Sequence, residues 1–239
     1  LKSVSWPKNL STIGDTAFQG SGVENITIPE GVQTIGNTVF RNCTSLKNVA
    51  LPKTLTSIGE NSFRGCTSLT SIVIPEKVTS IGAQAFNGDT GLKSVVILGD
   101  SVTVGNNVFS GIEFPIIYCK TITTTIPANS ATKIIVAYTD GGVFETAPTS
   151  SDSLSDPIKD GYRFAGWYNN TEFTGDQVTQ ITKTEGKNFS KYYAKWEKSS
   201  YTVPDELAFV DATYGENIEA QTIAVSLNSG EAPGSGGCT

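Results

Sequence analysis

The sequence predicts a mainly β protein in three parts: a solenoid of stacked coils at residues 1–130, a small β module at 131–198 and a partial β segment at 199–239. Three observations predict this architecture. A pattern recurs about every 23 residues in the first part, aromatic motifs cluster in the second, and two short apolar runs lie in the third. Repeats of roughly 20–50 residues are typical of arrays whose units stack on one another.

The repeat combines an Ile-Gly pair with a phenylalanine four residues after the glycine. Copies occur at Ile13/Gly14/Phe18, Ile35/Gly36/Phe40, Ile58/Gly59/Phe63, Ile81/Gly82/Phe86 and, with valine first, Val104/Gly105/Phe109. The copies lie 22, 23, 23 and 23 residues apart. A unit this short cannot bury its own apolar side, so a core forms only when the units stack. We therefore expect Phe40, Phe63 and Phe86 to lie in one column.

Each copy also contains an L-x-x-V-x-L segment, which in most copies ends at a proline, as at Pro52 and Pro75. This pattern predicts a short strand that the proline ends, because proline has no amide hydrogen. The glycine after isoleucine supplies either a turn or a close approach of neighbouring coils. Residues 112–130 lose the repeat, and we expect them to form a closing coil, with Cys119 in the core.

The motif CTSLxxIxIPxxVxSIGxxAF resembles the BspA-type (Treponema pallidum type) leucine-rich repeats of bacterial surface proteins. The resemblance covers Leu1 to about Ser110. It implies a curved, α/β horseshoe-like leucine-rich-repeat solenoid, with parallel strands on one face and short 3-10 or helical turns. The motif's cysteine is present at Cys43 and Cys66, whereas Ser21 and Asp89 occupy the matching places in other copies.

The two repeat cysteines allow two interpretations. Cys43 and Cys66 occupy equivalent positions in adjacent coils, so a disulfide between them is conceivable. The strain of bridging stacked positions, and the tendency of free cysteine to be buried, favour unpaired thiols in the core. A catalytic thiol lacks an activating base, because the chain has no histidine.

In an L-x-x-V-x-L strand, the residues between the apolar ones face solvent. Stacked coils then present a polar strip beside a patch that becomes more apolar in later coils. We expect a partner-binding face there, because solenoids present such faces to large partners. The alternative is an ordinary solvated sheet face, on which isolated exposed valines are common. The candidate residues are Lys47, Asn48, Thr70, Ser71, Val73, Lys93, Ser94 and Val96.

The second part resembles the Listeria–Bacteroides repeat, or internalin-type B repeat, through DGYRFAGWYNN at 160–170 and KYYAKWEK at 191–198. The resemblance implies a small β-grasp-like module with a helix or helical turn on a sheet. The aromatic residues predict its core, because a small module has little else to bury. Those expected to point inward are Phe164, Trp167, Tyr193 and Trp196. We expect Tyr168 and Tyr192 to be exposed, where they would be candidates for stacking on a sugar.

The third part has strand candidates at 207–210 and 222–227 and resembles the opening strands of an Ig-like sandwich. About 40 residues are too few to close such a sandwich of about 100. The segment is therefore either a truncated domain or a set of strands that packs on its neighbour. Its glycine-rich tail would leave Cys238 exposed.

Composition excludes several classes of function. The chain has 17 basic and 23 acidic residues and no basic block, which argues against binding nucleic acid. No apolar run is long enough to cross a membrane. Without histidine or clustered carboxylates, we expect no catalytic residue, no cofactor and no metal. Acidic loop residues such as Asp140, Asp152 and Asp156 fit no known calcium loop.

These observations predict a non-enzymatic, extracellular protein of the bacterial cell surface. We expect an adhesin-like binding module that contacts a host or microbial protein or glycan through the sheet face of the solenoid. One alternative is a carbohydrate-binding module of a larger surface glycan-processing protein, and another is a purely structural stalk. Methionine is absent even at position 1, so we also expect the chain to be a piece of a longer protein.

Overall fold

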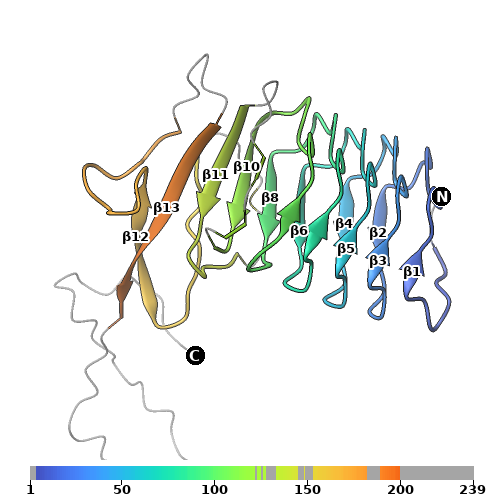
Figure 1. Ribbon diagram of the computed structural model, residues 1–239, viewed down its shortest axis with the longest axis horizontal. Helices are drawn as coiled ribbons and strands as arrows, with labels where there is room; N and C mark the ends of the chain where they lie inside the picture. Colours follow the sequence, from blue (N-terminus) through green and yellow to red (C-terminus); the bar gives the residue numbers. More distant parts are fainter. Residues whose placement is uncertain are drawn as a thin grey trace, which may run out of the picture.

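The computed structural model describes residues 4–121, 123–124, 126–127, 133–144, 148, 153–181 and 189–199. These residues form thirteen β-strands and no helix, stacked side by side along the long axis (Figure 1). The mainly β solenoid is therefore confirmed, but in the described residues hydrogen-bonded turns replace the expected 3-10 or helical turns. Apart from Ser199, the predicted segment 199–239 lies outside the described residues, and so does Cys238.

The Ile-Gly motifs form one parallel five-stranded sheet along one side of the coils. Its strands in spatial order are β1 (Thr12–Ile13), β3 (Thr34–Ile35), β5 (Ser57–Ile58), β7 (Ser80–Ile81) and β9 (Thr103–Val104). The register aligns Ile35 with Ile13 on one side and with Ile58 on the other. Each copy of the motif therefore adds one coil to the stack.

The L-x-x-V-x-L segments form the other side of the coils. β2 (Asn25–Thr27) and β4 (Asn48–Ala50) pair as a two-stranded parallel sheet. The next two segments, β6 (Ser71–Ile74) and β8 (Ser94–Ile97), belong to a six-stranded sheet with four later strands of the chain. Its order is β12 (Tyr162–Tyr168), β13 (Phe189–Lys198), β11 (Lys133–Tyr138), β10 (Glu113–Cys119), β8 and β6. Only β12 runs antiparallel to its neighbour in this sheet.

The sheet of the solenoid continues without a break into the second part of the chain. Ile117 of β10 is aligned with Val95 of β8 on one side and with Val136 of β11 on the other. Val136 in turn is aligned with Lys191 of β13. The closing-coil prediction is thus wrong in one respect, because β10 covers the edge of β8 but is itself covered by β11. The division of the chain at residues 130 and 198 stays a prediction.

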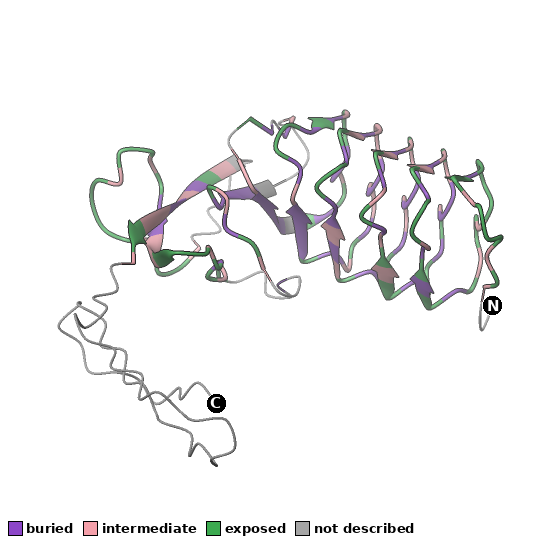
Figure 2. Ribbon diagram, turned by 90° about the horizontal axis from the view of Figure 1, so that it is seen from below, coloured by how far each residue is buried: buried purple, intermediate pink, exposed green. Residues whose placement is uncertain are grey.

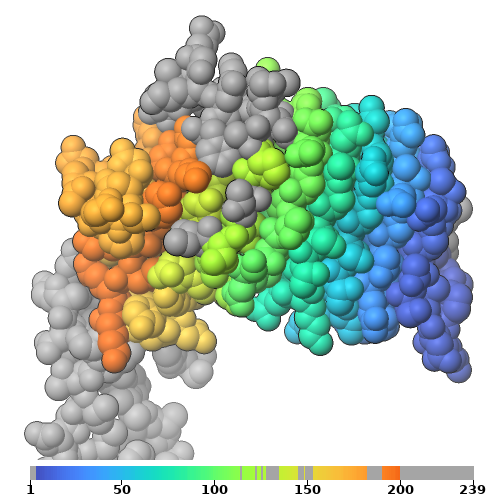
Figure 3. Space-filling model, in the orientation of Figure 1, coloured from blue at the N-terminus to red at the C-terminus, as the bar shows by residue number. Residues whose placement is uncertain are grey.

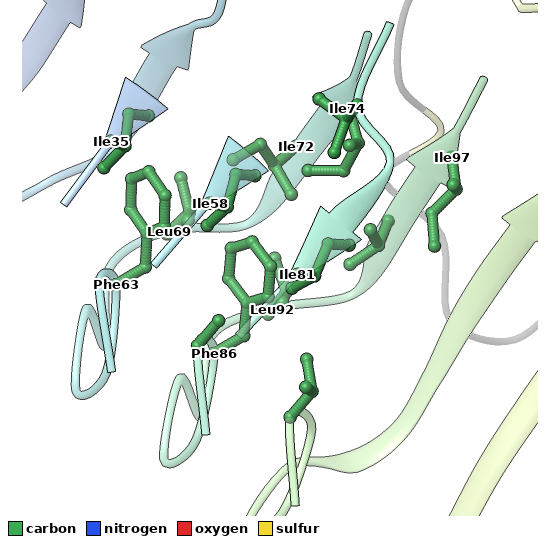
Figure 4. Close-up of a cluster of buried hydrophobic side chains, with 14 of the residues drawn as sticks. Ile35, Ile58, Phe63, Leu69, Ile72, Ile74, Ile81, Phe86, Leu92 and Ile97 are labelled. Carbon is green, nitrogen blue, oxygen red and sulfur yellow. The ribbon is translucent and has the colours of Figure 1, made fainter. Parts of the chain in front are cut away.

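The core of the solenoid is a column of stacked phenylalanine rings. The centroids of Phe18, Phe40, Phe63, Phe86 and Phe109 are separated in turn by 5.2, 5.2, 5.3 and 5.8 Å, with interplanar angles of 13°, 16°, 8° and 6°. Figure 4 shows Phe63 and Phe86 in this column beside the isoleucines and leucines of the same coils. The predicted single column is confirmed, and it explains why isolated coils have no core of their own.

Residues with a left-handed backbone conformation (positive φ) explain why no helical turn follows the Ile-Gly pair. They occur two places after each glycine and two places after each phenylalanine: Thr16, Gly20, Thr38, Asn42, Asn61, Gly65, Gln84, Gly88, Asn107 and Gly111. An α-helix of L-residues requires right-handed backbone throughout. The N–H groups of Thr38 and Phe40 instead donate to carbonyls of the next coil, at Glu60 (2.9 Å) and Ser62 (2.6 Å).

Thr38 is strained in this turn, which leads to a stability prediction. Its φ is +56°, a value that β-branched residues disfavour, whereas Asn61 and Asn107 hold the same place in later coils. We expect Thr38→Asn to raise the free energy of unfolding by about 1 kcal/mol in urea titration. Thr27→Asn, at an exposed strand position without a positive φ, should give no gain. Equal effects of the two substitutions would contradict the strain.

At Gly59, Gly82 and Gly105 the backbones of adjacent coils approach each other closely. A Cβ added to Gly59 would lie 2.5 Å from the carbonyl carbon and oxygen of Gly36. At Gly82 and Gly105 an added Cβ would lie 2.5 Å from a backbone nitrogen of the preceding coil. None of these glycines has a positive φ. Of the two roles that the sequence allows, close approach is therefore the one the structure has.

The cysteines of the described residues are buried, free thiols. Cys43 Sγ donates to the Phe18 carbonyl at 2.9 Å, and Cys66 Sγ donates to the Phe40 carbonyl at 3.1 Å. Burial raises the pKa of Cys66 and raises the pKa of Cys119 to about 12. The interpretation of unpaired core thiols is confirmed, and in their thiol form they are poor nucleophiles.

Candidate partner-binding face

The outward side of β2 and β4 is open to solvent. Asn25 and Thr27 of β2 are exposed, as are Asn48 and Ala50 of β4, while Ile26 between them is buried in the core. The Asn48 side-chain amide donates to the Asn25 Oδ1 at 2.6 Å, so side chains at equivalent positions of adjacent coils are hydrogen-bonded to each other. This surface is mostly polar, and its outward side chains are open to solvent among the described residues.

A charged column runs beside it. Lys47 Nζ lies 2.8 Å from Glu24 Oε2, and this hydrogen bond and charge lower the pKa of Glu24. Both side chains are more than half exposed, so solvent screens the pair and it adds little stability. Thr70 and Lys93 of later coils are exposed as well. They extend the column that the sequence predicts.

The predicted face is covered at its later coils. Ser71 and Val73 of β6 are half-buried, and Ser94 and Val96 of β8 are buried at 0% and 3% exposure. The Ser94 hydroxyl donates to the Pro148 carbonyl of the following part of the chain. The expectation that Ser94 and Val96 face solvent is therefore wrong. The cause is that residues of the second part of the chain, among them Pro148, Phe144 and Trp167, pack on this face of the sheet.

A second hydrophobic core forms on the covered side of the six-stranded sheet. Its buried members are Val96, Ile116, Tyr118, Ile135, Ala137, Trp167, Tyr192 and Ala194. Adjacent residues alternate between the two cores, since Val95 packs into the solenoid core and Val96 into the second one. Figure 2 shows that the strands in the middle of the molecule are buried, in contrast with the open strands nearer the N-terminus.

Tyr168 and Tyr192 do not form an exposed pair. Each is only 7% exposed, so the expected sugar-stacking platform is wrong. Tyr192 belongs to the second core, whereas Tyr168 is aligned with Tyr193, which packs against the solenoid core on the opposite face. Residues directly opposite each other in a pair of strands share a face, so the two tyrosines lie on different faces of the sheet.

The predicted aromatic core of the module is confirmed in part. Trp167 is buried in the second core, and Phe164 and Trp196 pack against it. Tyr193 points the other way and stacks on Tyr138, with ring centroids 5.3 Å apart. On β13, Tyr193 and Trp196 are three residues apart, so alternation places them on opposite faces. On β12, a bulge between Phe164 and Trp167 lets those two residues share a face.

Two shallow hollows mark the open side of the solenoid. One, of about 380 Å³, lies between β4 and β6 and is lined by Val49, Ala50 and Val73. No hydrogen-bonded pairing joins β4 to β6, although residues 4–121 are described without a gap. The other, of about 360 Å³, lies between Trp6 and β2. Sequence reasoning missed both, because each depends on the spacing of neighbouring coils.

The described residues contain no group of histidine, cysteine or carboxylate side chains that could hold a metal ion. Asp140, one of the acidic loop residues, is instead 3.3 Å from the Lys159 ammonium. Asp152, another of these acidic residues, lies outside the described residues. The described residues contain no helix that is long and apolar enough to cross a membrane.

Asp89 is a buried acidic residue, and the sequence did not reveal that burial changes its pKa. It takes the place that Cys43 and Cys66 hold in earlier coils, and its Oδ1 accepts the Cys66 N–H at 2.8 Å. Its Oδ2 is buried and has no hydrogen-bond partner among the described residues. Removal from water raises the pKa of Asp89 well above 3.8, against the backbone hydrogen bonds that lower it.

This raised pKa predicts that Asp89 makes the fold less stable as pH rises. Because the folded state holds the proton more tightly, the free energy of unfolding falls from about pH 4 upward, by at most about 1.4 kcal/mol per pH unit. Asp89→Asn keeps the Oδ1 acceptor and removes the titration. We expect the variant and the parent chain to have similar melting temperatures at pH 4 and the variant to melt higher at pH 8. The exposed substitution Asp176→Asn should change neither value, and parallel pH profiles for parent chain and Asp89→Asn would contradict the assignment.

Comparison with known protein families agrees with this architecture. The model of the BspA type leucine rich repeat region matches residues 1–114 in six copies. The model of the Listeria-Bacteroides repeat domain matches residues 137–195. The comparison with curated proteins gave no match. Neither family description names a catalytic activity.

Solved structures with a similar repeat are distant. The pneumococcal vaccine antigen PcpA is 22% identical, with a TM-score of 0.40 over 54% of this chain and 37% of that one. The T. pallidum leucine rich repeat protein TpLRR is 22% identical, with a TM-score of 0.41 over 56% and 69%. A leucine-rich repeat protein from Bacteroides ovatus ATCC 8483 is 23% identical, with a TM-score of 0.32 over 59% and 44%. This chain thus spans little more than a third of PcpA.

The stacked coils, the single phenylalanine column and the two family matches lead to one assignment. Residues 1–114 form a BspA-type leucine-rich-repeat region that continues, through the same sheet, into a Listeria-Bacteroides repeat domain at residues 137–195.

Proposed function

We propose that this chain is a non-enzymatic binding segment of a bacterial surface protein, and that it contacts a protein or glycan of a host or a neighbouring microbe. The contact surface is the open face of the solenoid, defined by the outward residues Asn25, Thr27, Asn48 and Ala50 and the adjoining Lys47 and Thr70. The observation that carries the proposal is that this face stays open while the same face of β8 is covered.

The chemistry of the open face supports contact with a large partner. Asn25 and Asn48 offer amide groups in a fixed row, and the hollow between β4 and β6 can receive an apolar side chain. Polar groups around an apolar centre are typical of interfaces that form between folded partners. BspA-type repeats are typical of bacterial surface proteins, which supports an extracellular location.

The test is a binding assay with immobilised chain against host matrix proteins, mucins and whole bacteria. The double substitution Asn48→Arg with Ala50→Arg places bulk and charge on the open face and should weaken any specific binding at least about tenfold. Asn106→Arg, exposed on the turn side of the solenoid, is the matched control and should bind like the parent chain. A folded chain that binds nothing, or a double variant that binds normally, would overturn the proposal.

A purely structural stalk predicts a different outcome. A stalk would give no saturable binding to any partner, and substitutions on the open face would be silent. The same assay therefore separates this alternative from a binding role without a further experiment.

A further inference from the structure

A hollow in the second module lies away from the open face of the solenoid. It has a volume of about 470 Å³ and is lined by residues of β12. This strand is at the end of the sheet opposite the first coils (Figure 1). In the space-filling view the module's orange atoms lie at the far end from the blue N-terminal coil (Figure 3). The volume is within the range of about 300–1,000 Å³ that is usual for small-molecule sites.

The bulge in β12 shapes this hollow. Gly166 lies in the bulge with φ of +110°, and a Cβ there would lie 2.7 Å from the Gln177 side chain. The Gln177 amide can therefore lie against the strand, where it donates to the Ala165 carbonyl at 2.8 Å. The next residue, Val178, donates its N–H to the Trp167 carbonyl at 2.8 Å. These bonds hold the segment after Gln177 beside β12 and leave the hollow between them.

Neutral polar groups and aromatic rings line the hollow together. Thr179 and Gln180 contribute a hydroxyl and an amide, each able to donate and to accept a hydrogen bond. Of the aromatic residues beside the hollow, Trp167 and Tyr168 are buried, whereas Phe164 is half-buried, so the Phe164 ring is the one that a ligand can contact. The C–H faces of a sugar ring pack on aromatic carbon, while its hydroxyl groups need neighbours that both donate and accept.

The charged groups in the hollow balance each other. Arg163 pairs with Glu197, and both side chains are about half exposed, so a ligand can reach them. Lys195 lies 5.4 Å from the centroid of the Tyr168 ring, and Asp156 completes the lining with a second carboxylate. An anionic ligand would meet two carboxylates and a cationic ligand two basic groups. A paired guanidinium and carboxylate instead offer a donor beside an acceptor, which matches two neighbouring hydroxyls.

From this lining we propose that the hollow beside β12 binds a neutral mono- or disaccharide. Arg163, Glu197, Thr179 and Gln180 bond its hydroxyl groups, and the half-buried ring of Phe164 contacts its apolar face. The site is separate from the open face of the solenoid, so the chain can hold a partner and a glycan at once. It also differs from the pair Tyr168 and Tyr192, because Tyr192 does not line it.

The test is saturation-transfer NMR on the full 239-residue chain, with N-acetylglucosamine, galactose and cellobiose as neutral probes and glucose 6-phosphate and glucosamine as charged ones. We expect transfer to at least one neutral sugar, with a Kd of about 1 mM or tighter. Thr179→Ala with Gln180→Ala, and separately Arg163→Ala, should each weaken binding about tenfold. All three side chains are exposed, so the variants should melt like the parent chain.

Two controls make the outcome decisive. Gln33→Ala, an exposed glutamine of the solenoid, should bind the sugar normally, and so should the double variant Asn48→Arg with Ala50→Arg. A folded chain that gives no transfer to any neutral sugar overturns the proposal. So does a preference for the charged probes, or normal binding by the Arg163→Ala and Thr179/Gln180 variants. None of these results bears on binding by the solenoid face.

Discussion

A chain in which Gly59 is replaced by alanine is expected to lose about 3 kcal/mol or more of its free energy of unfolding. The added methyl group would lie 2.5 Å from the carbonyl carbon and oxygen of Gly36, which belong to the backbone of the adjacent coil. No side-chain rotation relieves that contact, so the two coils must move apart. Inserting a methyl into a packed interior usually costs about 1–3 kcal/mol even where side chains can adjust.

Gly14 provides the matched control, because an added Cβ there meets no described atom within 4 Å. Gly14→Ala should change the free energy of unfolding by less than about 0.5 kcal/mol. Thermal unfolding should show the difference as a fall of about 6–12 °C for Gly59→Ala alone. If both variants melt like the parent chain, neighbouring coils are not in backbone contact at the glycine column.

Replacing Val96 by lysine is expected to destabilise the chain by about 4 kcal/mol or more. Val96 is 3% exposed and packs in the second core with Tyr118 and Trp167. A lysine there must bury an ammonium group or push the covering segment off the sheet, and the valine's own burial is lost in either case. Exposure of the second core would also promote aggregation.

Ala50 occupies the place of Val96 two coils earlier and is exposed. Ala50→Lys is therefore the control, and it should change stability by less than about 0.5 kcal/mol. Guanidinium titration of the two variants compares one position of the repeat in two environments. Equal, small effects would mean that the face of β8 is open, as the sequence alone predicts.

The sequence was sufficient for those features that depend on neighbours one repeat away. A phenylalanine occurs in every coil at the same offset from Ile-Gly. Stacking the copies therefore places the Phe63 ring between those of Phe40 and Phe86. The same logic placed Cys43 and Cys66 in the core. In each case the residues that decide the environment belong to the repeat itself.

The sequence was insufficient where the environment comes from outside the repeat. Val96 and Val73 occupy the same position of the pattern, yet Val96 is buried because a segment from the second module lies over β8. Tyr168 was misplaced for a related reason. Alternation places it on the face away from Trp167, as the structure does, but the Phe173 ring of the following loop packs against it, with ring centroids 5.6 Å apart.

Candidate sites were harder to predict than the fold. The open face at Asn48 could be predicted, because solvent-facing positions follow from strand alternation. The hollow beside β12 could not, since it needs Gln177 to fold back on Gly166. Asp89 was visible as a departure from the repeat, but its unpaired Oδ2 depends on packing that only three-dimensional structure shows.

The solenoid and the second module share one sheet, and we expect them to unfold together. Native-state hydrogen exchange at increasing denaturant tests it most directly, on the amides of β8, β10, β11 and β13. We expect these strands to share one opening free energy within about 1 kcal/mol, because strands of one cooperative unit exchange through the same event. If β11 and β13 instead open at clearly lower free energy while β8 and β10 stay protected, the two parts are separate units and the claim is wrong.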